Sequence, residues 1–528
     1  MNFLNRLFLS GLFLLGFSLH LCAQPVIVNQ PVNQTVLWGD MATFSVKVAE
    51  TGPFNYQWQL NGTNLLNNVI TTVAGNGDTN FSGDGGLAIN ASLYYPQGVA
   101  FDAMGNLYIA DNNHDRVRKV DTNGIITTVA GNGAGAITNG GSFSGDGGAA
   151  TNAGLYRPNN LAFDIAGNMY IADIFNDRIR KVDTNGIITT VAGNGTEIDS
   201  GNGNQATNAG LALPASVAVN TQGEIYVADL FFAHSGTIRK VDTNGIISTI
   251  AGNYPTNNNL GDGGMATNAY LNTPQGVALD SLGTIYIADT LNARIRQINT
   301  NGIITTIAGG GNNRSATGIM ATNALLGRLW SVILDHAGNL YFADTVYNLV
   351  HKVDTNGIIS TVAGKLPFGG YSGDEGAATN ATLSQPACVA LDPAGNLFIA
   401  DWYNNRIREV QLAGSPTITL SNASITNAGD YRVIITSSSG SVTSSVVTLN
   451  VQLPPITAVP VFTSSNSMCS FTWNAVSNLT YQLQSAASLA DPIWVDLGNP
   501  VTATNNSAST SVTVGPDTQR FYRIRQGP

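Results

Sequence analysis

The sequence is poor in charged residues, cysteine and histidine. Charged residues occupy 11% of the 528 positions, against roughly 25% in an average soluble protein. The helix formers Glu, Lys and Arg are therefore scarce, which argues against a helical fold. Hydrophobic residues reach 43%, too many for a disordered chain. The many Gly, Asn, Thr, Val and Ile residues instead predict an all-β protein of short strands and tight turns.

Positive charge is also scarce. Lys and Arg number 23 against 33 Asp and Glu, which gives a formal net charge of −10. Binding to a phosphate backbone depends on clustered cations, and the sequence contains no such cluster. We therefore expect neither nucleic acid nor an anionic membrane surface as a partner.

Long apolar runs are absent beyond the N-terminus. Residues 7–21 are largely apolar, Arg6 precedes them, and Ala23 offers a small residue for cleavage. This pattern predicts a signal peptide over residues 1–23 and an exported protein, extracellular, on the cell surface or periplasmic. A lipid anchor on Cys22 is the alternative, which the bulky Leu21 disfavours. No later stretch is long and apolar enough to span a membrane, so we expect no membrane insertion after cleavage.

An internal repeat fills the middle of the chain. A Tyr-Ile-Ala-Asp phrase recurs with small changes every 55 to 62 residues, and its aspartates are Asp111, Asp173, Asp229, Asp289, Asp344 and Asp401. An apolar run precedes each Asp, and an Arg-Ile-Arg-Lys-Val type strand follows it. An Asn-Gly hairpin then leads to Ile-Thr-Thr-Val-Ala-Gly. Each unit predicts four antiparallel strands, and such units repeated radially form a β-propeller.

The strand counts predict how the propeller closes. The first three strands occur six times, and so does Ile-Thr-Thr-Val-Ala-Gly. The first copy of that strand, Val69–Gly75, precedes the first unit, whereas the last unit ends at Val410 without a fourth strand. We therefore predict that Val69–Gly75 completes the sixth blade and removes an open edge that would otherwise aggregate.

Two segments carry a resemblance to a known family. NLYIADNNHDRVRKV and NLFIADWYNNRIREV resemble the NHL repeats of six-bladed bacterial propellers, and the resemblance covers residues 67–412. It implies a six-bladed propeller that binds proteins, glycans or other ligands. A minority of six-bladed relatives are enzymes such as lactonases and lyases, so the resemblance leaves an enzyme open.

The segments on either side of the propeller predict one interrupted β-sandwich. Residues 24–66 contain strand-like alternation and Trp58, and residues 413–452 contain Asp430-Tyr431, which resembles the tyrosine corner of immunoglobulin domains. Joined, they resemble an immunoglobulin-like domain in which an apolar pair, Phe44 and Val433, replaces the disulfide. A propeller clasped by its own N-terminal strand suits insertion, because its two ends lie close together.

Residues 456–528 predict a third unit. They alternate like strands, offer Trp473, Tyr481 and Trp494 for a core, and resemble a fibronectin type III-like β-sandwich. Cys388 and Cys469, which remain after signal cleavage, fall in different predicted domains, so we expect no disulfide framework.

Residues suited to catalysis do not converge in the sequence. The repeated aspartates occur in every blade, and four have an arginine five residues later, at Arg116, Arg178, Arg294 and Arg406. We interpret them as a structural turn network. The Gly-Asp-Gly-Gly loops contain Asp84, Asp146 and Asp262, with Asp374 in a variant. Each loop offers one carboxylate, whereas Ca²⁺ requires six to eight oxygens.

The pore is expected to lack catalytic and metal-binding groups. Cys388 occupies a position that other blades give to Gly, Asn or Ser, so we interpret it as a buried small residue. The predicted pore-lining positions are Gln97, Asn159, Ala215, Gln275, Trp330 and Ala387. None is His, Asp or Glu. We therefore predict no catalytic residue, no metal site, no cofactor and no enzyme.

Blade-specific residues suggest a binding face opposite the Asn-Gly turns. The fifth repeat departs most, with Leu329, Trp330 and Leu349 replacing Pro, Gln and Arg. Aromatic residues and Arg are typical anchors of interfaces. We predict a ligand patch on the fifth and sixth blades formed by Arg328, Trp330, Tyr347, Trp402 and Tyr403. Neutral drift and packing against neighbouring loops are the alternatives.

These features predict an exported, non-catalytic binding or scaffold protein. We expect a monomer that presents a propeller face to a protein or glycan ligand. The alternatives are a propeller enzyme, either a lyase or a lactonase, and a purely structural adhesion module of the cell surface.

Overall fold

The computed structural model of the chain is all-β, and its described helices are three-residue 3-10 turns. It describes residues 24–526 except for 50–53, 66–67, 135–142, 231–235, 254–259, 315–316, 367–368, 394, 413–415, 421–422, 438, 454–455, 464–467, 477–478, 491, 505–506 and 514–519. The predicted signal peptide, residues 1–23, lies outside the described residues. No helix in the described part of the chain has the length and apolar character needed to cross a membrane.

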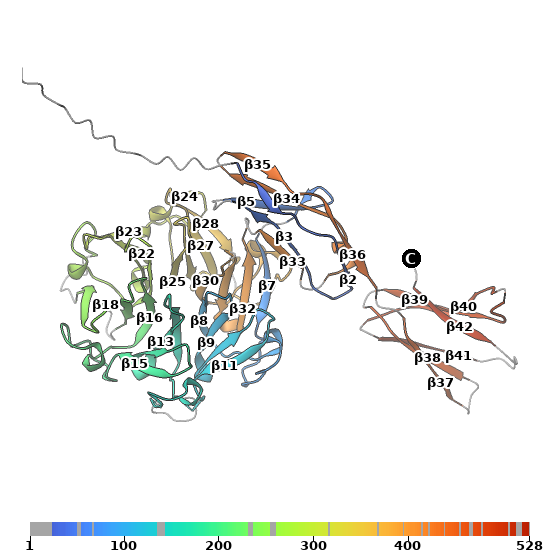
Figure 1. Cartoon of the computed structure of the whole chain (residues 1–528), viewed down its shortest axis with the longest axis horizontal. Coiled ribbons are helices and arrows are strands. Elements are labelled where there is room, and N and C mark those ends of the chain that lie inside the picture. Colours follow the sequence, from blue (N-terminus) through green and yellow to red (C-terminus); the bar gives the residue numbers. More distant parts are fainter. Residues whose placement is uncertain are drawn as a thin grey trace, which may run out of the picture. The chain divides into compact units, whose positions relative to one another are not determined.

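Six blades, each with four antiparallel core strands, form a propeller (Figure 1). The first strands of blades one to six are β8 (Pro96–Phe101), β12 (Pro158–Phe163), β16 (Pro214–Val219), β20 (Pro274–Leu279), β25 (Leu329–Leu334) and β30 (Pro386–Leu391). The second strands are β9 (Leu107–Asp111), β13 (Met169–Asp173), β17 (Ile225–Asp229), β21 (Ile285–Asp289), β26 (Leu340–Asp344) and β31 (Leu397–Asp401). The six-bladed all-β architecture predicted from the repeat is therefore confirmed.

The outer strands follow the same repeat. The third strands are β10 (Arg116–Val120), β14 (Arg178–Val182), β18 (Thr237–Val241), β22 (Arg294–Ile298), β27 (Leu349–Val353) and β32 (Arg406–Gln411). The fourth strands are β11 (Ile126–Ala130), β15 (Ile188–Ala192), β19 (Ile247–Ala251), β23 (Ile304–Gly309), β28 (Ile358–Ala363) and, for blade six, β7 (Val69–Ala74). Two short edge strands, β24 (Ile319–Met320) and β29 (Gly376–Ala377), extend blades five and six.

The N-terminal strand β7 closes the ring. It pairs antiparallel with β32, so that Ile70 lies opposite Val410 and Ala74 opposite Ile407. Figure 1 shows this blue strand beside the orange β32, although more than three hundred residues separate them. The predicted clasp is therefore confirmed.

Each blade contains short 3-10 turns, which the sequence did not predict. One group precedes the first strands: η1 (Ala88–Asn90), η4 (Ala150–Asn152), η6 (Ala206–Asn208), η7 (Ala266–Asn268), η9 (Ala321–Asn323) and η10 (Ala378–Asn380). A second group joins second to third strands: η2 (Asn112–His114), η5 (Ile174–Asn176), η8 (Thr290–Asn292) and η11 (Trp402–Asn404). The first group starts with a buried Ala, which lets the turn pack closely against the preceding fourth strand.

The Asn-Gly hairpins form as predicted between third and fourth strands. In blade one, Asp121 Oδ1 accepts hydrogen bonds at 2.9 Å from the backbone N–H groups of Asn123 and Ile125. Gly124 adopts φ +79°, a conformation that glycine takes without strain. The turn chemistry thus sets the register of this hairpin locally.

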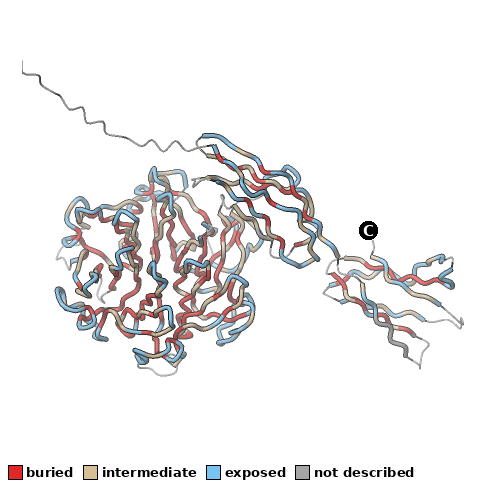
Figure 2. Tube along the Cα trace, viewed as in Figure 1, coloured by how far each residue is buried: buried red, intermediate tan, exposed pale blue. Residues whose placement is uncertain are grey.

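The apolar cores lie between neighbouring blades. One core joins Ala74, Cys388 and Ile407 of blade six to Val99 and Ile109 of blade one. Figure 2 shows the inner strands as buried and the loops as exposed. Because each core is built from two blades, ring closure buries the apolar faces that the first and last blades would otherwise expose.

Strands from both sides of the propeller pair with each other. β5 (Asn55–Leu60) pairs antiparallel with β34 (Gly429–Ser437). The other strands here are β1 (Ile27–Asn29), β2 (Gln34–Leu37), β3 (Ala42–Ser45), β4 (Lys47–Val48), β6 (Thr63–Asn64), β33 (Thr417–Leu420), β35 (Gly440–Thr443) and β36 (Val447–Gln452), with the turn η12 (Ile425–Asn427). An interrupted domain requires such pairing across the insert. The immunoglobulin-like class remains a prediction.

Aromatic rings pack around Phe44 near β5, and its predicted pairing with Val433 stays a prediction. The ring of Phe44 stacks on that of Tyr431 with centroids 4.6 Å apart, and the Trp58 ring lies 6.4 Å away. Val433 is buried and lies opposite Trp58 in the ladder. Phe44 therefore packs against other aromatic rings, and Tyr431 is its stacking partner.

The chain divides into two compact units, and the second holds the C-terminal strands. These form two three-stranded sheets: β37 (Ala458–Thr463), β38 (Met468–Asn474) and β41 (Ser507–Thr513), and β40 (Val495–Thr502), β39 (Thr480–Ala486) and β42 (Phe521–Gln526). Trp473 and Tyr481 pack in their core. Trp494 does not, because it is half-buried beneath the Arg523 guanidinium, 4.3 Å from its ring. Both described cysteines are free.

Candidate ligand-binding channel

A central channel runs between the first strands, which contact one another in a closed ring. Its narrow neck is lined by Gln97, Asn159, Ala215, Gln275, Trp330 and Ala387, together with Asn160, Ser331 and Cys388. The first six are the positions that the sequence predicted for the pore. The neck shares lining residues with a cavity on either side. We call the one of about 640 Å³ the apolar cavity and the one of about 390 Å³ the aromatic cavity.

The aromatic cavity lies at the end of the channel that carries the turns between second and third strands. Its lining residues are Tyr95, Gln97, Asn112, Asn113, Arg157, Asn159, Ile174, Phe175, Leu213, Leu230, Gln275, Trp330 and Trp402. Blades one, two, three and six contribute residues from these turns or from the segment before their first strand, and blades four and five contribute Gln275 and Trp330 from the first strand itself. The cavity is therefore a product of the whole ring.

Four aromatic rings from three blades gather at one side of this cavity. Trp330 and Trp402 have centroids 5.0 Å apart. Tyr95 lies 5.1 Å from Trp402 and 5.2 Å from Tyr403, and Trp402 lies 4.6 Å from Tyr403. Such offset and edge-on contacts fix ring orientation. We call Tyr95, Trp330, Trp402 and Tyr403 the aromatic cluster.

The structure brings together three of the five predicted patch residues. Trp330, Trp402 and Tyr403 belong to the aromatic cluster, whereas Arg328 and Tyr347 are not among the cavity's lining residues. Arg328 is exposed, and its carbonyl accepts hydrogen bonds from the Thr345 amide and hydroxyl, both at 2.9 Å. Tyr347 is half-buried and donates its N–H to Asp344 at 3.2 Å.

Tyr95 belongs to the aromatic cluster, but the sequence did not predict it as a binding residue. It precedes β8 with φ +54°, and Arg157, Leu213, Thr273 and Gln385 share this left-handed conformation in other blades. The amide N–H of Tyr95 donates to Asn405 Oδ1 of blade six at 2.9 Å. We call this hydrogen bond between blades six and one the Asn405 latch. It orients Tyr95 towards Trp402. The signal in the sequence was a variable residue just before each first strand.

The aromatic cavity combines aromatic rings with side-chain amides, which are Gln97, Asn112, Asn113, Asn159 and Gln275. Among its described lining residues, Arg157 is the only charged one, and there is no carboxylate, His, Cys or Ser. The Trp330 and Trp402 indole N–H groups and Asn159 Oδ1 are buried without a partner in the described part of the chain. Buried polar groups are normally hydrogen-bonded. These three therefore mark positions for a ligand or ordered water.

The chain matches known family models over much of the propeller. Residues 58–142, 129–200, 194–257 and 253–326 match the Teneurin NHL domain, which spans about half of the chain, and residues 383–409 match the NHL repeat. The chain belongs to the NHL-repeat family. Human teneurin-1 is 29% identical over 326 residues, which make up 57% of this chain and 11% of teneurin-1. The chain thus spans about a tenth of the length of that relative.

Two solved structures illustrate the range of similar propellers. An auxiliary nutrient binding protein from Bacteroides thetaiotaomicron superposes with a TM-score of 0.47 and 14% identity, over 74% of this chain and 97% of that one. Virginiamycin B lyase from Staphylococcus aureus superposes with a TM-score of 0.38 and 14% identity, over 68% of this chain and 99% of that one.

The repeated aspartates of this NHL propeller bind the loops of their own blade, as Asp111 does by accepting a hydrogen bond from the Tyr94 amide at 2.8 Å. In blade one, Asp111 is fully buried and accepts a hydrogen bond from Arg118 at 3.3 Å. Arg118 in turn pairs with Asp84 of the Gly-Asp-Gly-Gly loop at 2.7 Å. The partner is thus the arginine seven residues on. The expected partner, Arg116, instead donates to two backbone carbonyls and covers the Phe81 ring.

Blade five keeps the repeated Asp, Asp344, but replaces the buried Arg and the loop Asp of this network with uncharged side chains. His351 stands where other NHL blades have the buried Arg, and Thr317 stands in place of the loop Asp. Burial raises the pKa of Asp344 to about 6 and lowers the pKa of His351 to about 4. The substitutions at His351 and Thr317 in the fifth blade therefore change internal packing.

Histidines and carboxylates do not assemble into a metal site in the part of the chain that the structure describes. His114 Nδ1 lies 2.8 Å from Asp111, and its Nε2 lies 2.9 Å from the Thr79 carbonyl. The Gly-Asp-Gly-Gly carboxylates pair with buried arginines, as Asp146 does with Arg180 at 2.6 Å. His234 lies outside the described residues.

A half-buried acid next to the clasp, Glu409, predicts a pH-dependent stability. Burial, and then Asp392, raise the pKa of Glu409 to about 7. A folded-state pKa above the usual 4.5 contributes stability at low pH that is lost as the pH rises through about 7. We expect the melting temperature to fall between pH 6 and 8, and less so in Glu409→Gln. Calorimetric melts at both pH values measure this.

The repeat itself supplies a stabilising variant for this test. Four blades carry Lys where blade six has Glu409, at Lys119, Lys181, Lys240 and Lys352. Glu409→Lys is therefore expected to raise the melting temperature at pH 8. Glu197→Gln removes an exposed acid and serves as the control. Equal pH dependence in wild type and Glu409→Gln would contradict the assignment.

Proposed function

We propose that this NHL propeller is an exported, non-catalytic binding protein that takes its ligand, a glycan or a protein, in the aromatic cavity. The observation that carries the proposal is the aromatic cluster at the side of a cavity whose lining holds no acid, base or nucleophile. An immunoglobulin-like domain over residues 24–66 and 413–452 and a C-terminal module over 456–528 would carry the propeller.

The chemistry of the cavity favours a neutral sugar over a charged ligand. Flat apolar faces of sugar rings stack on Trp and Tyr, and sugar hydroxyls accept hydrogen bonds from indole N–H groups. Both buried indole N–H groups lack an acceptor in the described part of the chain. A cavity of about 390 Å³ lies within the range of roughly 300–1,000 Å³ typical of small-ligand sites. A protein loop with an exposed aromatic or amide side chain is the second candidate.

The two alternative functions, an enzyme and an adhesion module, require different chemistry in the aromatic cavity. A lyase or lactonase needs a general base or a metal beside its substrate, which the described lining of the aromatic cavity does not supply. A purely structural adhesion module would leave the cluster without a ligand. Binding without turnover is therefore the outcome that separates the proposal from both.

The test uses the full exported chain on a glycan array, with capture of proteins as the second arm. For a ligand found in either arm, Trp330→Ala and Trp402→Ala are each expected to raise the dissociation constant about tenfold or more, since aromatic anchors dominate binding energy. Titration calorimetry measures the constants. Trp494→Ala, on the C-terminal unit, is the matched control and should leave them unchanged. Unchanged affinity in both cavity variants would contradict the proposed site.

A further inference from the structure

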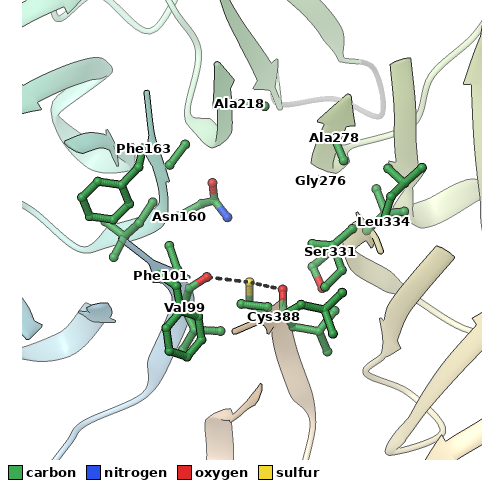
Figure 3. A pocket seen from close by; sticks show the side chains of 18 of the residues that line it. Val99, Phe101, Asn160, Phe163, Ala218, Gly276, Ala278, Ser331, Leu334 and Cys388 are labelled. Carbon is green, nitrogen blue, oxygen red and sulfur yellow. Dashed lines mark hydrogen bonds between the residues drawn. The ribbon is translucent and has the colours of Figure 1, made fainter. Parts of the chain in front are cut away.

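The channel has a second cavity at the opposite end, beyond the neck. Its walls come from the first strands of all six blades, and its volume is about 640 Å³ (Figure 3). The aromatic cluster is not part of it. Any ligand here would therefore be held by different residues from those of the proposed function.

Two rings of apolar side chains line this apolar cavity. The inner ring consists of Val99, Leu161, Val217, Val277, Val332 and Val389. The outer ring consists of Phe101, Phe163, Val219, Leu279, Leu334 and Leu391. The inner-ring side chains are 1–5% exposed and pack in the interblade cores, whereas the outer-ring side chains are half-buried, so each blade offers the cavity one accessible large apolar side chain. Apolar walls with a few polar groups are typical of small-molecule sites.

Several polar groups near the neck are already engaged, whereas the buried Ser331 hydroxyl has no partner in the described part of the chain. Asn160 Oδ1 accepts a hydrogen bond from the Val217 amide at 3.1 Å, and the Ser216 hydroxyl accepts one from Val277 at 3.4 Å. The Cys388 thiol points towards the carbonyls of Val99 and Val389, as Figure 3 shows. Burial raises the pKa of Cys388 to about 11, so the thiol stays protonated. This end of the cavity therefore offers a ligand mainly shape and apolar contact, with the Ser331 hydroxyl as an unpaired polar group.

The rim combines negative charge with exposed apolar residues. Asp102, Asp335 and Asp392 lie at the rim with His336, and the described lining contains no Lys or Arg. Burial would raise the pKa of Asp102, but hydrogen bonds from Asn106, Met104 and Tyr108 outweigh it and keep the carboxylate charged.

The turns that begin at this rim expose large apolar side chains. Met104, Ile165 and Leu282, in blades one, two and four, are 75%, 82% and 80% exposed. Apolar residues clustered around a cavity commonly mark a binding surface. They lie in the turns that directly follow the first strands and are not themselves lining residues of the cavity.

We propose that the apolar cavity binds an amphipathic small molecule with an apolar body and a cationic head group. The apolar body fits inside the outer ring, where it leaves water. The head group remains at the rim, where three carboxylates and no Lys or Arg among the described lining residues attract a cation and repel an anion. This site is separate from the proposed function and does not depend on it.

A matched pair of decyl amphiphiles tests the head-group preference on the full chain. Nile red, which is neutral, reports occupancy through its fluorescence in apolar surroundings. Decyltrimethylammonium, below its micelle concentration, is expected to displace Nile red at least tenfold more effectively than decanoate at low ionic strength. The difference should shrink as salt screens the rim. Absence of saturable Nile red binding, or equal displacement by both amphiphiles, would overturn the proposal.

The site is located with variants that copy a neighbouring blade. Ala218 and Ala278 line the cavity, and blade five carries Ile333 at the same position of its first strand. The double variant Ala218→Ile with Ala278→Ile is expected to keep the melt and weaken Nile red binding at least fivefold. Trp402→Ala, at the other end of the channel, should leave it unchanged. The reverse pattern would assign the probe to the aromatic cavity and overturn the proposal.

A direct map keeps the test decisive if the double variant folds poorly. A decylammonium probe with a diazirine on its alkyl chain is cross-linked to wild-type protein, and the labelled peptides are identified by mass spectrometry. Labels on the first strands, near Val277 or Val389, support the proposal. Labels confined to other segments overturn it.

Discussion

Deletion of Val69–Gly75 is expected to abolish the cooperative melt of the propeller and cause aggregation. β7 supplies the whole fourth strand of blade six, and its loss leaves β32 with unpaired N–H and C=O groups along one edge. Open edges of this kind pair with other chains. The deletion also removes Ile70 and Ala74, both fully buried, from two different interblade cores. Size-exclusion chromatography and calorimetry measure both effects.

A single substitution tests the same clasp with less disruption. Ile70→Asp places a carboxylate in a fully buried position, which should cost more than about 3 kcal/mol of unfolding free energy. Limited proteolysis should then cut the segment around β7 before any other part of the propeller. Thr127→Asp, at an exposed position of the fourth strand of blade one, is the control. A monomeric deletion variant with an unchanged melt would rule out the clasp.

The propeller could be predicted because its determinants are local and repeated. Alternating apolar runs, Asn-Gly hairpins and the count of fourth strands each depend on neighbouring residues. Six copies in the same register then make the strand assignment more certain than any single copy could. The clasp followed from the count alone, since Val69–Gly75 had no other strand to join.

The partner of the repeated Asp could not be predicted for a physical reason. Asp111 lies opposite Arg116 in the ladder, and Arg118 follows two residues later on the same face. Both guanidinium groups can approach the carboxylate. The arginine that reaches it is the one whose side chain lies in the buried interior, where Asp84 also meets it. Burial of this kind depends on the neighbouring loop and not on local spacing.

The residues of the aromatic cluster also divide into those that the sequence indicated and one that it did not. Trp330 and Trp402 stood out because they differ from the repeat at positions that the fold places near the channel axis. Tyr95 did not, because its direction depends on a left-handed backbone and on a latch from Asn405, far away in sequence. Blade five lacks the same latch, since Ala293 replaces the Asp or Asn. Arg328 is not among the left-handed residues and lies outside the cavity lining.

Arg180→Leu is expected to cost about 3–5 kcal/mol of unfolding free energy, the usual effect of breaking a buried ion pair from one side. Arg180 is fully buried and bridges Asp173 at 3.3 Å and Asp146 at 2.6 Å. Leucine fills part of the space but leaves the Asp173 carboxylate buried without a cation. Guanidinium unfolding followed by tryptophan fluorescence measures the loss.

The control for this prediction lies two residues earlier on the same strand. Arg178 is half-buried, donates to the carbonyls of Asn176 and Asn194, and covers Phe143 at 3.7 Å. Arg178→Leu should therefore cost only about 1 kcal/mol. Equal losses in the two leucine variants would contradict the buried network.

The loss in Arg180→Leu should also depend on pH in a defined direction. Burial raises the pKa of Asp173 to about 6 even with Arg180 present, and removing the cation raises it further. A raised folded-state pKa means that Asp173 favours folding at low pH and that this contribution is lost as the pH rises. The variant should thus lose least near pH 5 and most near pH 8. Arg180→His combined with Asp146→Thr copies the His351 and Thr317 of blade five and should retain more stability than the leucine variant at pH 7. A leucine variant whose loss is the same at both pH values would show that Asp173 is not left charged in the core.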